Sequence, residues 1–222
     1  MIFNLVFSKT KFIMKINYVL ISDGSSDSAL IKIINFCLKK HFGDIVIAGQ
    51  RADLYRVNRR QKTLVEKIRA SIDYYEPGII FIHRDAEKQL LETREEEIND
   101  AIKEIIIGEY KGKYIRVIPI KMMEAWLLTD EMAIRYASGN PNGTAKLDMP
   151  DIKKIEQLTD PKYTLKKLIC DASELKGRRL KKLEMKLSAA IHLVAEYTED
   201  FSPLSSLRAF QNFESQIAKL KE

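Results

Sequence analysis

The chain has 222 residues and a formal net charge of +6, and its shares of hydrophobic (45%) and charged (31%) residues are those of an ordinary globular protein. This composition excludes an intrinsically disordered chain, and no apolar run reaches the roughly 18–20 residues that a membrane-spanning helix needs. The two cysteines, Cys37 and Cys170, fall in apolar helical patterns. They predict reduced core thiols, which is typical of a cytoplasmic protein.

The first thirteen residues precede the first predicted strand. Their apolar run is short, lysines interrupt it, and no small-residue cleavage site follows, so the pattern does not indicate a signal peptide. We expect residues 1–13 to be a loosely ordered extension and the folded domain to begin at Met14.

Residues 14–137 alternate between short apolar runs and amphipathic stretches. The apolar runs predict strands at 18–21, 45–48, 79–82 and 114–120, and the helical spacing predicts helices at about 26–42, 64–75, 88–106 and 124–137. Strands that alternate with helical crossovers form parallel sheets. The sequence therefore predicts an α/β fold with a parallel sheet of about four strands and helices on both faces.

The remainder of the chain, 138–222, has a different character. Residues 138–151 are rich in Gly, Asn and Pro and predict a long loop, whereas residues 151–222 show helical patterns and no strand. We expect a helical C-terminal region that packs on the α/β domain.

Acidic residues follow three of the four predicted strands. In an open α/β sheet, functional residues gather at the carboxyl ends of the strands. Carboxylates that converge there repel one another unless a cation neutralises them, and hard oxygen ligands favour Mg²⁺ or Mn²⁺. The candidate metal ligands are Asp23, Asp27, Asp85, Glu87 and Glu124, and His83 lies among them.

Each of these residues also has a structural alternative. Asp23 and Asp27 could be turn or helix-start residues, and Asp85 and Glu87 also suit a helix start, where capping and the helix dipole favour acids. His83 could be a packing or hydrogen-bonding residue at a strand end. Glu124 lies in an apolar setting, so its carboxylate needs a partner, which could be a metal, a lysine or a helix N-terminus.

Two basic clusters, at 51–62 and 176–186, account for much of the positive charge. Each is either a solvated helix face or a contact surface for a nucleic-acid backbone. The candidate nucleic-acid ligands are Arg51, Arg56, Arg59, Arg60, Lys62, Arg178, Arg179, Lys181 and Lys182.

The strand-end segments resemble the Toprim superfamily, which includes topoisomerases, primases and the overcoming-lysogenization-defect nucleases. "LISDGSSDSALI" is similar to the first Toprim element, with Asp23-Gly24 where Glu-Gly is usual. "IIFIHRDAE" is similar to the second, with His83-Arg84-Asp85 where Asp-x-Asp is usual. The stretches "IPIKMMEAWLLTD", "IEQLTDPKYTLKKL" and "FSPLSSLRAF" resemble an uncharacterised bacterial Toprim-like family.

The resemblance implies Asp23, Asp85 and Glu124 as catalytic residues of a Mg²⁺- or Mn²⁺-dependent nuclease, with Asp27 or Glu87 completing the metal site. It also implies a bacterial anti-phage or mobile-element effector that acts with a separate ATPase. The alternative is a catalytically degenerate module that binds nucleic acid or a partner protein, since Asp23 and His83 replace the usual Glu and Asp.

Overall fold

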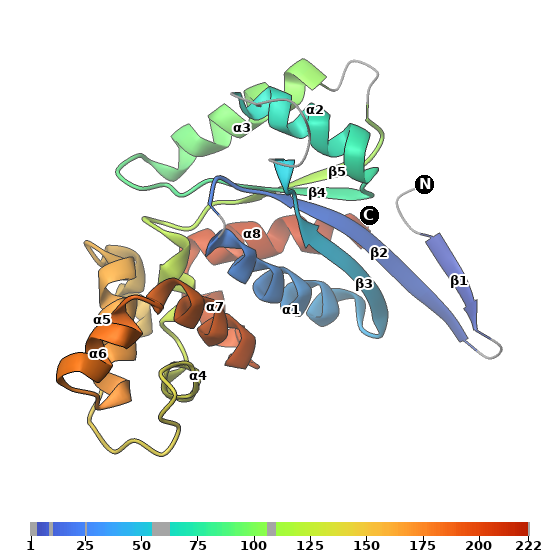
Figure 1. Ribbon diagram of the computed structural model, residues 1–222. Helices are drawn as coiled ribbons and strands as arrows, with labels where there is room; N and C mark the ends of the chain where they lie inside the picture. Colours follow the sequence, from blue (N-terminus) through green and yellow to red (C-terminus); the bar gives the residue numbers. More distant parts are fainter. Residues whose placement is uncertain (1–3, 9–10, 25, 55–62, 106–109, 222) are drawn as a thin grey trace. The chain divides into compact units, whose positions relative to one another are not determined.

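A long central strand, β2 (Lys11–Ile21), organises the sheet in the computed structural model, which describes residues 4–8, 11–24, 26–54, 63–105 and 110–221. β2 pairs in parallel with β3 (Ile45–Arg51) on one side and with β4 (Ile79–His83) on the other, and β4 pairs in parallel with β5 (Lys113–Val117). The parallel strands thus run in the order β3-β2-β4-β5. The predicted α/β fold with four parallel strands is confirmed (Figure 1).

The beginning of β2 differs from the sequence prediction. The strand starts at Lys11 and not at Tyr18, and β1 (Asn4–Ser8) pairs with it antiparallel, from Asn4 opposite Lys15 to Ser8 opposite Lys11. Most of the stretch 1–13, for which we expected a loose extension, is therefore strand. Backbone pairing supplies the order that its interrupted apolar pattern did not predict.

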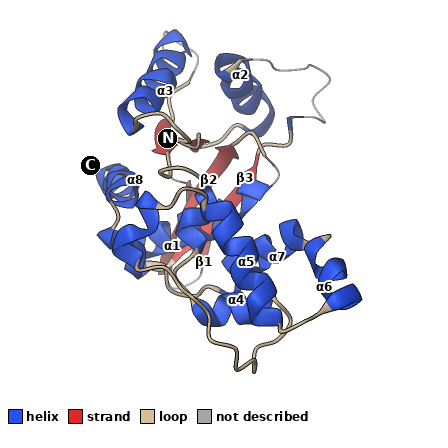
Figure 2. Ribbon diagram, turned by 90° about the vertical axis from the view of Figure 1, so that its left-hand side faces the viewer, coloured by secondary structure: helices blue, strands red, loops and turns tan. Residues whose placement is uncertain are grey.

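Helices cover both faces of the sheet. α2 (Leu64–Tyr75) and α3 (Leu91–Ile105) lie on one face, and α1 (Leu30–Phe42) and the C-terminal part of α8 (Arg208–Ala218) lie on the other (Figures 1 and 2). The predicted apolar face of α1 is buried, and every residue of β4 is buried, as its uninterrupted apolar run predicts.

The chain forms two compact units, each described by itself. The first comprises residues 1–84, 89–118 and 212–222 and contains the sheet; the second comprises 85–88 and 119–211. The helical character predicted for the C-terminal region is confirmed, and residues 138–221 contain no strand. Helices of the second unit are α4 (Glu131–Ala137), α5 (Pro161–Ser173), α6 (Gly177–Glu184) and α7 (Leu187–Tyr197), with 3-10 segments η3 (Met123–Leu127), η4 (Ile152–Gln157) and η5 (Ser202–Ser206).

The helix predicted at 124–137 is interrupted. η3 ends at Leu127, and α4 starts after Asp130, whose carboxylate accepts a hydrogen bond from the Ala133 amide at 3.0 Å. An N-cap acid in extended conformation starts a new helix. Trp126 of η3 is fully buried and packs edge-on against Phe210 with ring centroids 5.3 Å apart, as expected for a core residue.

Candidate functional site

The turn after β2 separates its two acids. The backbone N–H of Gly24 donates to Oδ2 of Asp27 at 2.8 Å, and the Ser26 hydroxyl donates to Oδ1 at 3.3 Å. Asp27 is 7% exposed and belongs to the short 3-10 helix η1 (Ser26–Ala29) that leads into α1. Its carboxylate therefore closes the turn, which is the structural alternative we considered for it, and it also reaches the end of β4.

His83, the last residue of β4, faces Asp27. Its Nδ1 lies 3.0 Å from the carbonyl oxygen of Val117 on β5, and its Nε2 lies 3.9 Å from Oδ2 of Asp27. A backbone carbonyl only accepts hydrogen bonds, so Nδ1 carries the proton. Nε2 is thus the ring nitrogen that faces the carboxylate. This is the arrangement in which a histidine ligates a metal or accepts a proton.

Asp23 points to two cations. Its carboxylate forms ion pairs with Lys67 of α2 and with Arg84, which follows β4 directly. Partial burial by itself would raise the pKa of Asp23, but the hydrogen bond from Lys67 and the charge of Arg84 outweigh it and lower the pKa below its ordinary value. The Asp23 side chain remains 55% exposed, so it is accessible to a ligand.

Arg84 is held from a second side by Glu97 of α3. The Arg84 Nε atom donates to Glu97 at 3.0 Å, and Arg94 donates to the other oxygen of Glu97 at 2.7 Å. These contacts lower the pKa of Glu97 although its partial burial would raise it. Lys67 and Arg84 were absent from the predicted site. The position of Arg84 two residues after the strand predicted at 79–82 could have indicated it, whereas nothing in the sequence marks Lys67.

Glu124 lies in the second unit and is 2% exposed. Its Oε1 is 3.0 Å from Nζ of Lys162, in the first turn of α5, whose N-cap is Asp160. Two segments that carry the family resemblance, the Glu-Ala-Trp-Leu-Leu and Asp-Pro-Lys stretches, therefore meet in this ion pair. A lysine is one of the three partners that the apolar setting of Glu124 predicted.

Asp85 and Glu87 belong to the same unit as Glu124. They lie on a short segment whose amides donate to the backbone at 119–121, from Ala86 to Pro119 at 3.1 Å and from Glu87 to Lys121 at 2.9 Å. Asp85 is partly buried and Glu87 is exposed. Neither is within α3, which begins at Leu91, so the interpretation of Glu87 as a first-turn helix acid is wrong.

The predicted metal ligands thus form two groups, Asp23 and Asp27 with His83 in the first unit, and Asp85, Glu87 and Glu124 in the second. Their convergence on one ion stays a prediction from the sequence. Over the described part of the chain, no three His, Cys, Asp or Glu side chains form a metal site by themselves. Of this pair, the Asp27 carboxylate is a hard oxygen ligand of the kind that Mg²⁺ and Mn²⁺ take, whereas the imidazole of His83 is a ligand more typical of softer transition metals.

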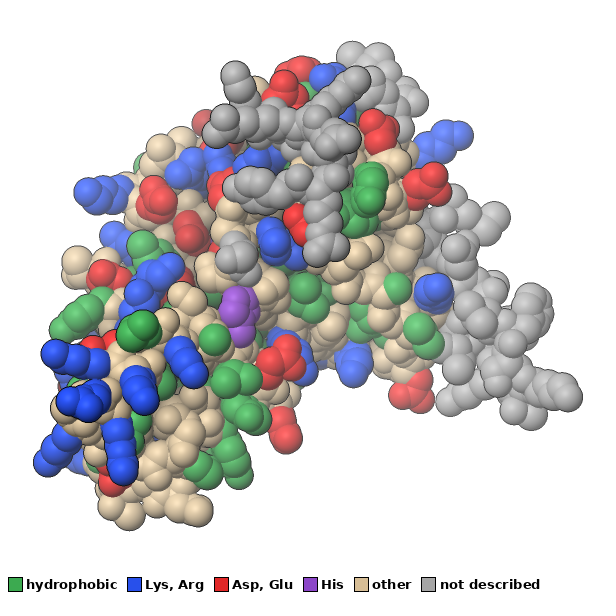
Figure 3. All heavy atoms as spheres, in the orientation of Figure 1, with side chains coloured by type: hydrophobic (Ala, Val, Ile, Leu, Met, Phe, Trp, Pro, Cys, Tyr) green, Lys and Arg blue, Asp and Glu red, His purple; other side chains and the backbone are tan. Residues whose placement is uncertain are grey.

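The candidate nucleic-acid ligands fall into a described and an undescribed group. The four basic residues of α6, Arg178, Arg179, Lys181 and Lys182, are all exposed, and α6 buries none of its residues. Figure 3 shows the Lys and Arg side chains gathered over this helix. Arg51 ends β3 and is partly exposed. Arg56, Arg59, Arg60 and Lys62 lie outside the described residues.

Both cysteines are free thiols; Cys37 is buried, and burial raises the pKa of its thiol well above the ordinary range. Among the described helices, none combines the length and the apolar character needed to cross a membrane.

Comparisons with protein-family models, with curated proteins and with solved structures find no match.

Proposed function

We propose that the protein is a Mg²⁺- or Mn²⁺-dependent phosphodiesterase that cleaves nucleic acid. The observation that carries this proposal is the strand-end arrangement of Asp27, His83 and Asp23, with Lys67 and Arg84 on the Asp23 carboxylate. It combines groups that can hold a hard cation, groups that can bind a phosphate and a carboxylate that can accept a proton, all at the carboxyl edge of a parallel sheet.

Lys67 and Arg84 would bind the scissile phosphate. A phosphate oxygen is a strong acceptor for lysine and arginine, and it can replace Asp23 as their anionic partner. The loss of these cations would return the pKa of Asp23 toward its ordinary value, because they are what lowers it. Substrate binding would thus make Asp23 a better base at the moment when a base is needed.

The released Asp23 carboxylate would accept a proton from the attacking water. The water oxygen forms a bond to phosphorus, the phosphorus–oxygen ester bond breaks, and the leaving oxygen takes a proton from solvent. Glu97 would keep Arg84 in place throughout, because it contacts Nε and leaves the Nη1 side toward the phosphate.

Asp27 and His83 would hold the divalent ion in the first unit, and the Toprim resemblance assigns Asp23, Asp85, Glu87 and Glu124 to the same metal site. A bound divalent ion stabilises charge on the phosphate oxygens and lowers the pKa of bound water. The resemblance further supports a bacterial anti-phage or mobile-element effector that acts with a separate ATPase.

The test is cleavage of labelled single- and double-stranded DNA and RNA with Mn²⁺, Mg²⁺ or a chelator. We expect metal-dependent cleavage that falls at least about 100-fold in Asp27→Asn and in Arg84→Gln. The control Asp73→Asn removes an exposed acid of α2 and should keep full activity. Asp73 lies outside the strand-end cluster, which consists of Asp23, Asp27, His83, Lys67 and Arg84. Intact substrates with both metals, also after addition of any ATPase that is encoded nearby, would overturn the proposal.

A second candidate is a nucleic-acid-binding module without catalysis. It is favoured by the double ion pair of Asp23, which already neutralises the position where the family has a metal-binding Glu. In this case DNA or RNA binds without cleavage. The steepness of a plot of the logarithm of the binding constant against the logarithm of the salt concentration should then fall by about 2 in Lys181→Gln/Lys182→Gln. Each phosphate contact contributes about 0.9 to this slope for duplex DNA. Lys153→Gln/Lys154→Gln is the matched control in the same unit, and an equal effect there would exclude α6 as the contact surface.

A further inference from the structure

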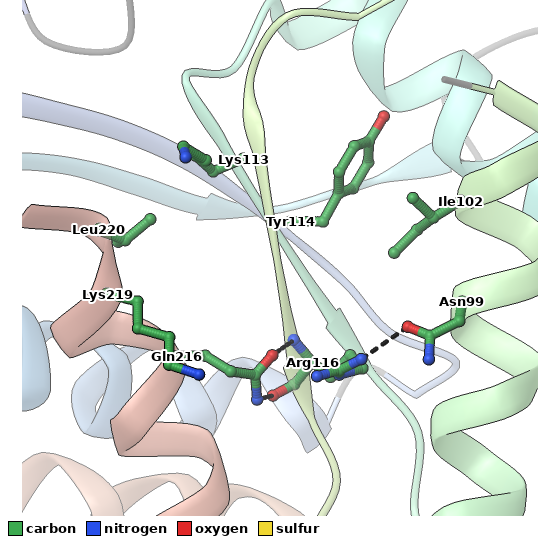
Figure 4. Close-up of a pocket in the computed structure, with 8 residues that line it drawn as sticks. All are labelled: Asn99, Ile102, Lys113, Tyr114, Arg116, Gln216, Lys219 and Leu220. Carbon is green, nitrogen blue, oxygen red and sulfur yellow. Dashed lines mark hydrogen bonds between the residues drawn. The ribbon is translucent and has the colours of Figure 1, made fainter. Parts of the chain in front are cut away.

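A cavity of about 290 Å³ lies at the edge of the sheet, in the first unit. It is lined by residues of α3, β5 and α8 and of the short 3-10 segment η6 (Lys219–Lys221) that follows α8. Figure 4 shows the lining residues on both sides of β5. Its volume is near the lower end, roughly 300 Å³, of the range typical of small-molecule sites.

The charge of the lining is positive only. Lys113 and Arg116 come from β5 and Lys219 from η6, and none of the eight lining residues is acidic. Among the described residues, no carboxylate forms an ion pair with any of these three side chains. The strand-end cluster is different, because there Lys67 and Arg84 are already paired with Asp23. Three uncompensated cations around one cavity favour an anionic ligand.

Arg116 is positioned by a neutral group. Its Nη1 donates to Oδ1 of Asn99 at 2.6 Å, which fixes the guanidinium without neutralising it (Figure 4). Its Nε is buried and has no hydrogen-bond acceptor within the described structure. A buried donor without an acceptor is costly and is rare in native proteins, and because Nε itself is enclosed, a ligand oxygen would accept from an N–H group of Arg116 that faces the cavity.

The side chain of Gln216 of α8 blocks the free edge of β5, so that another strand cannot pair there. Its Oε1 accepts from the Arg116 amide at 3.0 Å and its Nε2 donates to the Arg116 carbonyl at 3.2 Å, so the side chain takes the place that a neighbouring strand would occupy. An added strand would have to displace it. The cavity is therefore suited to a small ligand and not to an extended peptide.

We propose that this cavity binds a small phosphate-bearing ligand of about the size of a mononucleotide. Lys113, Arg116 and Lys219 would attract the phosphate, since lysine and arginine are its usual protein ligands. Ile102, Tyr114 and Leu220 provide the apolar part of the lining for the remainder of the ligand. The site is separate from the strand-end cluster, and the proposal does not depend on nuclease activity.

The experiment is calorimetric titration of the full chain with inorganic phosphate and, separately, with AMP, in the presence of a chelator so that metal-dependent binding does not contribute. We expect saturable binding of one equivalent. Lys113→Gln/Lys219→Gln should weaken it by about tenfold or more, because hydrogen bonds to charged groups are lost. Lys39→Gln/Lys111→Gln changes the net charge equally with exposed lysines outside the cavity and should leave the affinity unchanged.

The two probes distinguish the source of the phosphate. Tighter binding of AMP identifies a phosphorylated organic ligand, and equal binding identifies the free anion. An unchanged affinity in Lys113→Gln/Lys219→Gln, an equal loss of affinity in Lys39→Gln/Lys111→Gln, or no saturable binding in the wild type would overturn the proposal.

Discussion

The acids after β2 have different surroundings although only three residues separate them. Asp27 accepts hydrogen bonds within its own turn and is buried, whereas Asp23 is half exposed and pairs with cations from two other elements. The sequence indicated both as strand-end acids. Asp27 closes the turn through local contacts with Gly24 and Ser26, whereas the partners of Asp23 lie 44 and 61 residues away in the chain.

The paired Asp23 predicts a pH-dependent contribution to stability. Its pKa is lowered in the folded protein, so the contribution is present above the ordinary carboxyl pKa and is lost as the pH falls through the folded value. Asp23→Asn should lower the free energy of unfolding at pH 7 by less than about 1 kcal/mol, because the pair is half exposed. Urea unfolding at pH 7 and at about pH 3 checks this. A deficit of the same size at both pH values would contradict it.

The Glu124–Lys162 pair predicts a larger effect. Removal of Lys162 leaves a buried carboxylate without its cation, which costs about 3–5 kcal/mol in fully buried pairs. Because Lys162 is 41% exposed, we expect about 2–3 kcal/mol for Lys162→Met. Urea unfolding measures it, and Glu124→Gln/Lys162→Met should cost clearly less than the two single changes together. Lys166→Met on the same helix is the control, and strict additivity would contradict the direct pair.

At the scale of elements, local patterns determined most boundaries. α2 begins with a capping box in which the Thr63 side chain accepts from the Glu66 amide at 3.1 Å and the Glu66 carboxylate accepts from the Thr63 amide at 3.0 Å. The sequence Thr-Leu-Val-Glu contains this signal. β2, in contrast, extends seven residues further toward the N-terminus than predicted, because pairing with β1 and β3 supports residues that have no clear strand pattern.

The contact between β2 and β3 predicts a strict requirement for glycine. A Cβ atom at Gly49 would lie 2.1 Å from the ring of Tyr18, its partner in register. The ring cannot move freely, because its hydroxyl donates to Asn35 at 2.9 Å and it packs on Phe81. Gly49→Ala should therefore destabilise the fold by about 1–3 kcal/mol in urea unfolding. Val46→Ala, at an exposed position of the same strand, should cost less, and equal costs would contradict the steric argument.

At the scale of the whole molecule, the metal ligands predicted from the sequence come from both units, Asp27 from the first and Asp85 from the second. If they hold one ion, Asp27→Asn and Asp85→Asn should each abolish thermal stabilisation by Mn²⁺, which for the wild type amounts to about 2.7 kcal/mol at 100 times the dissociation constant. Differential scanning calorimetry with and without Mn²⁺ measures this. Full stabilisation retained in Asp85→Asn and lost in Asp27→Asn would assign the ion to the first unit alone.

The sequence by itself determined the α/β class, the four parallel strands, the helical C-terminal region and the acids after β2 and β4, because apolar periodicity and capping are local properties. The tertiary structure alone decided that Lys67 and Arg84 form ion pairs with Asp23, that Lys162 pairs with Glu124, and that a cationic cavity lies beside β5. The physical reason is that these groups are brought together by strand order and helix packing. Contacts between residues far apart in the chain leave no periodic trace in the sequence.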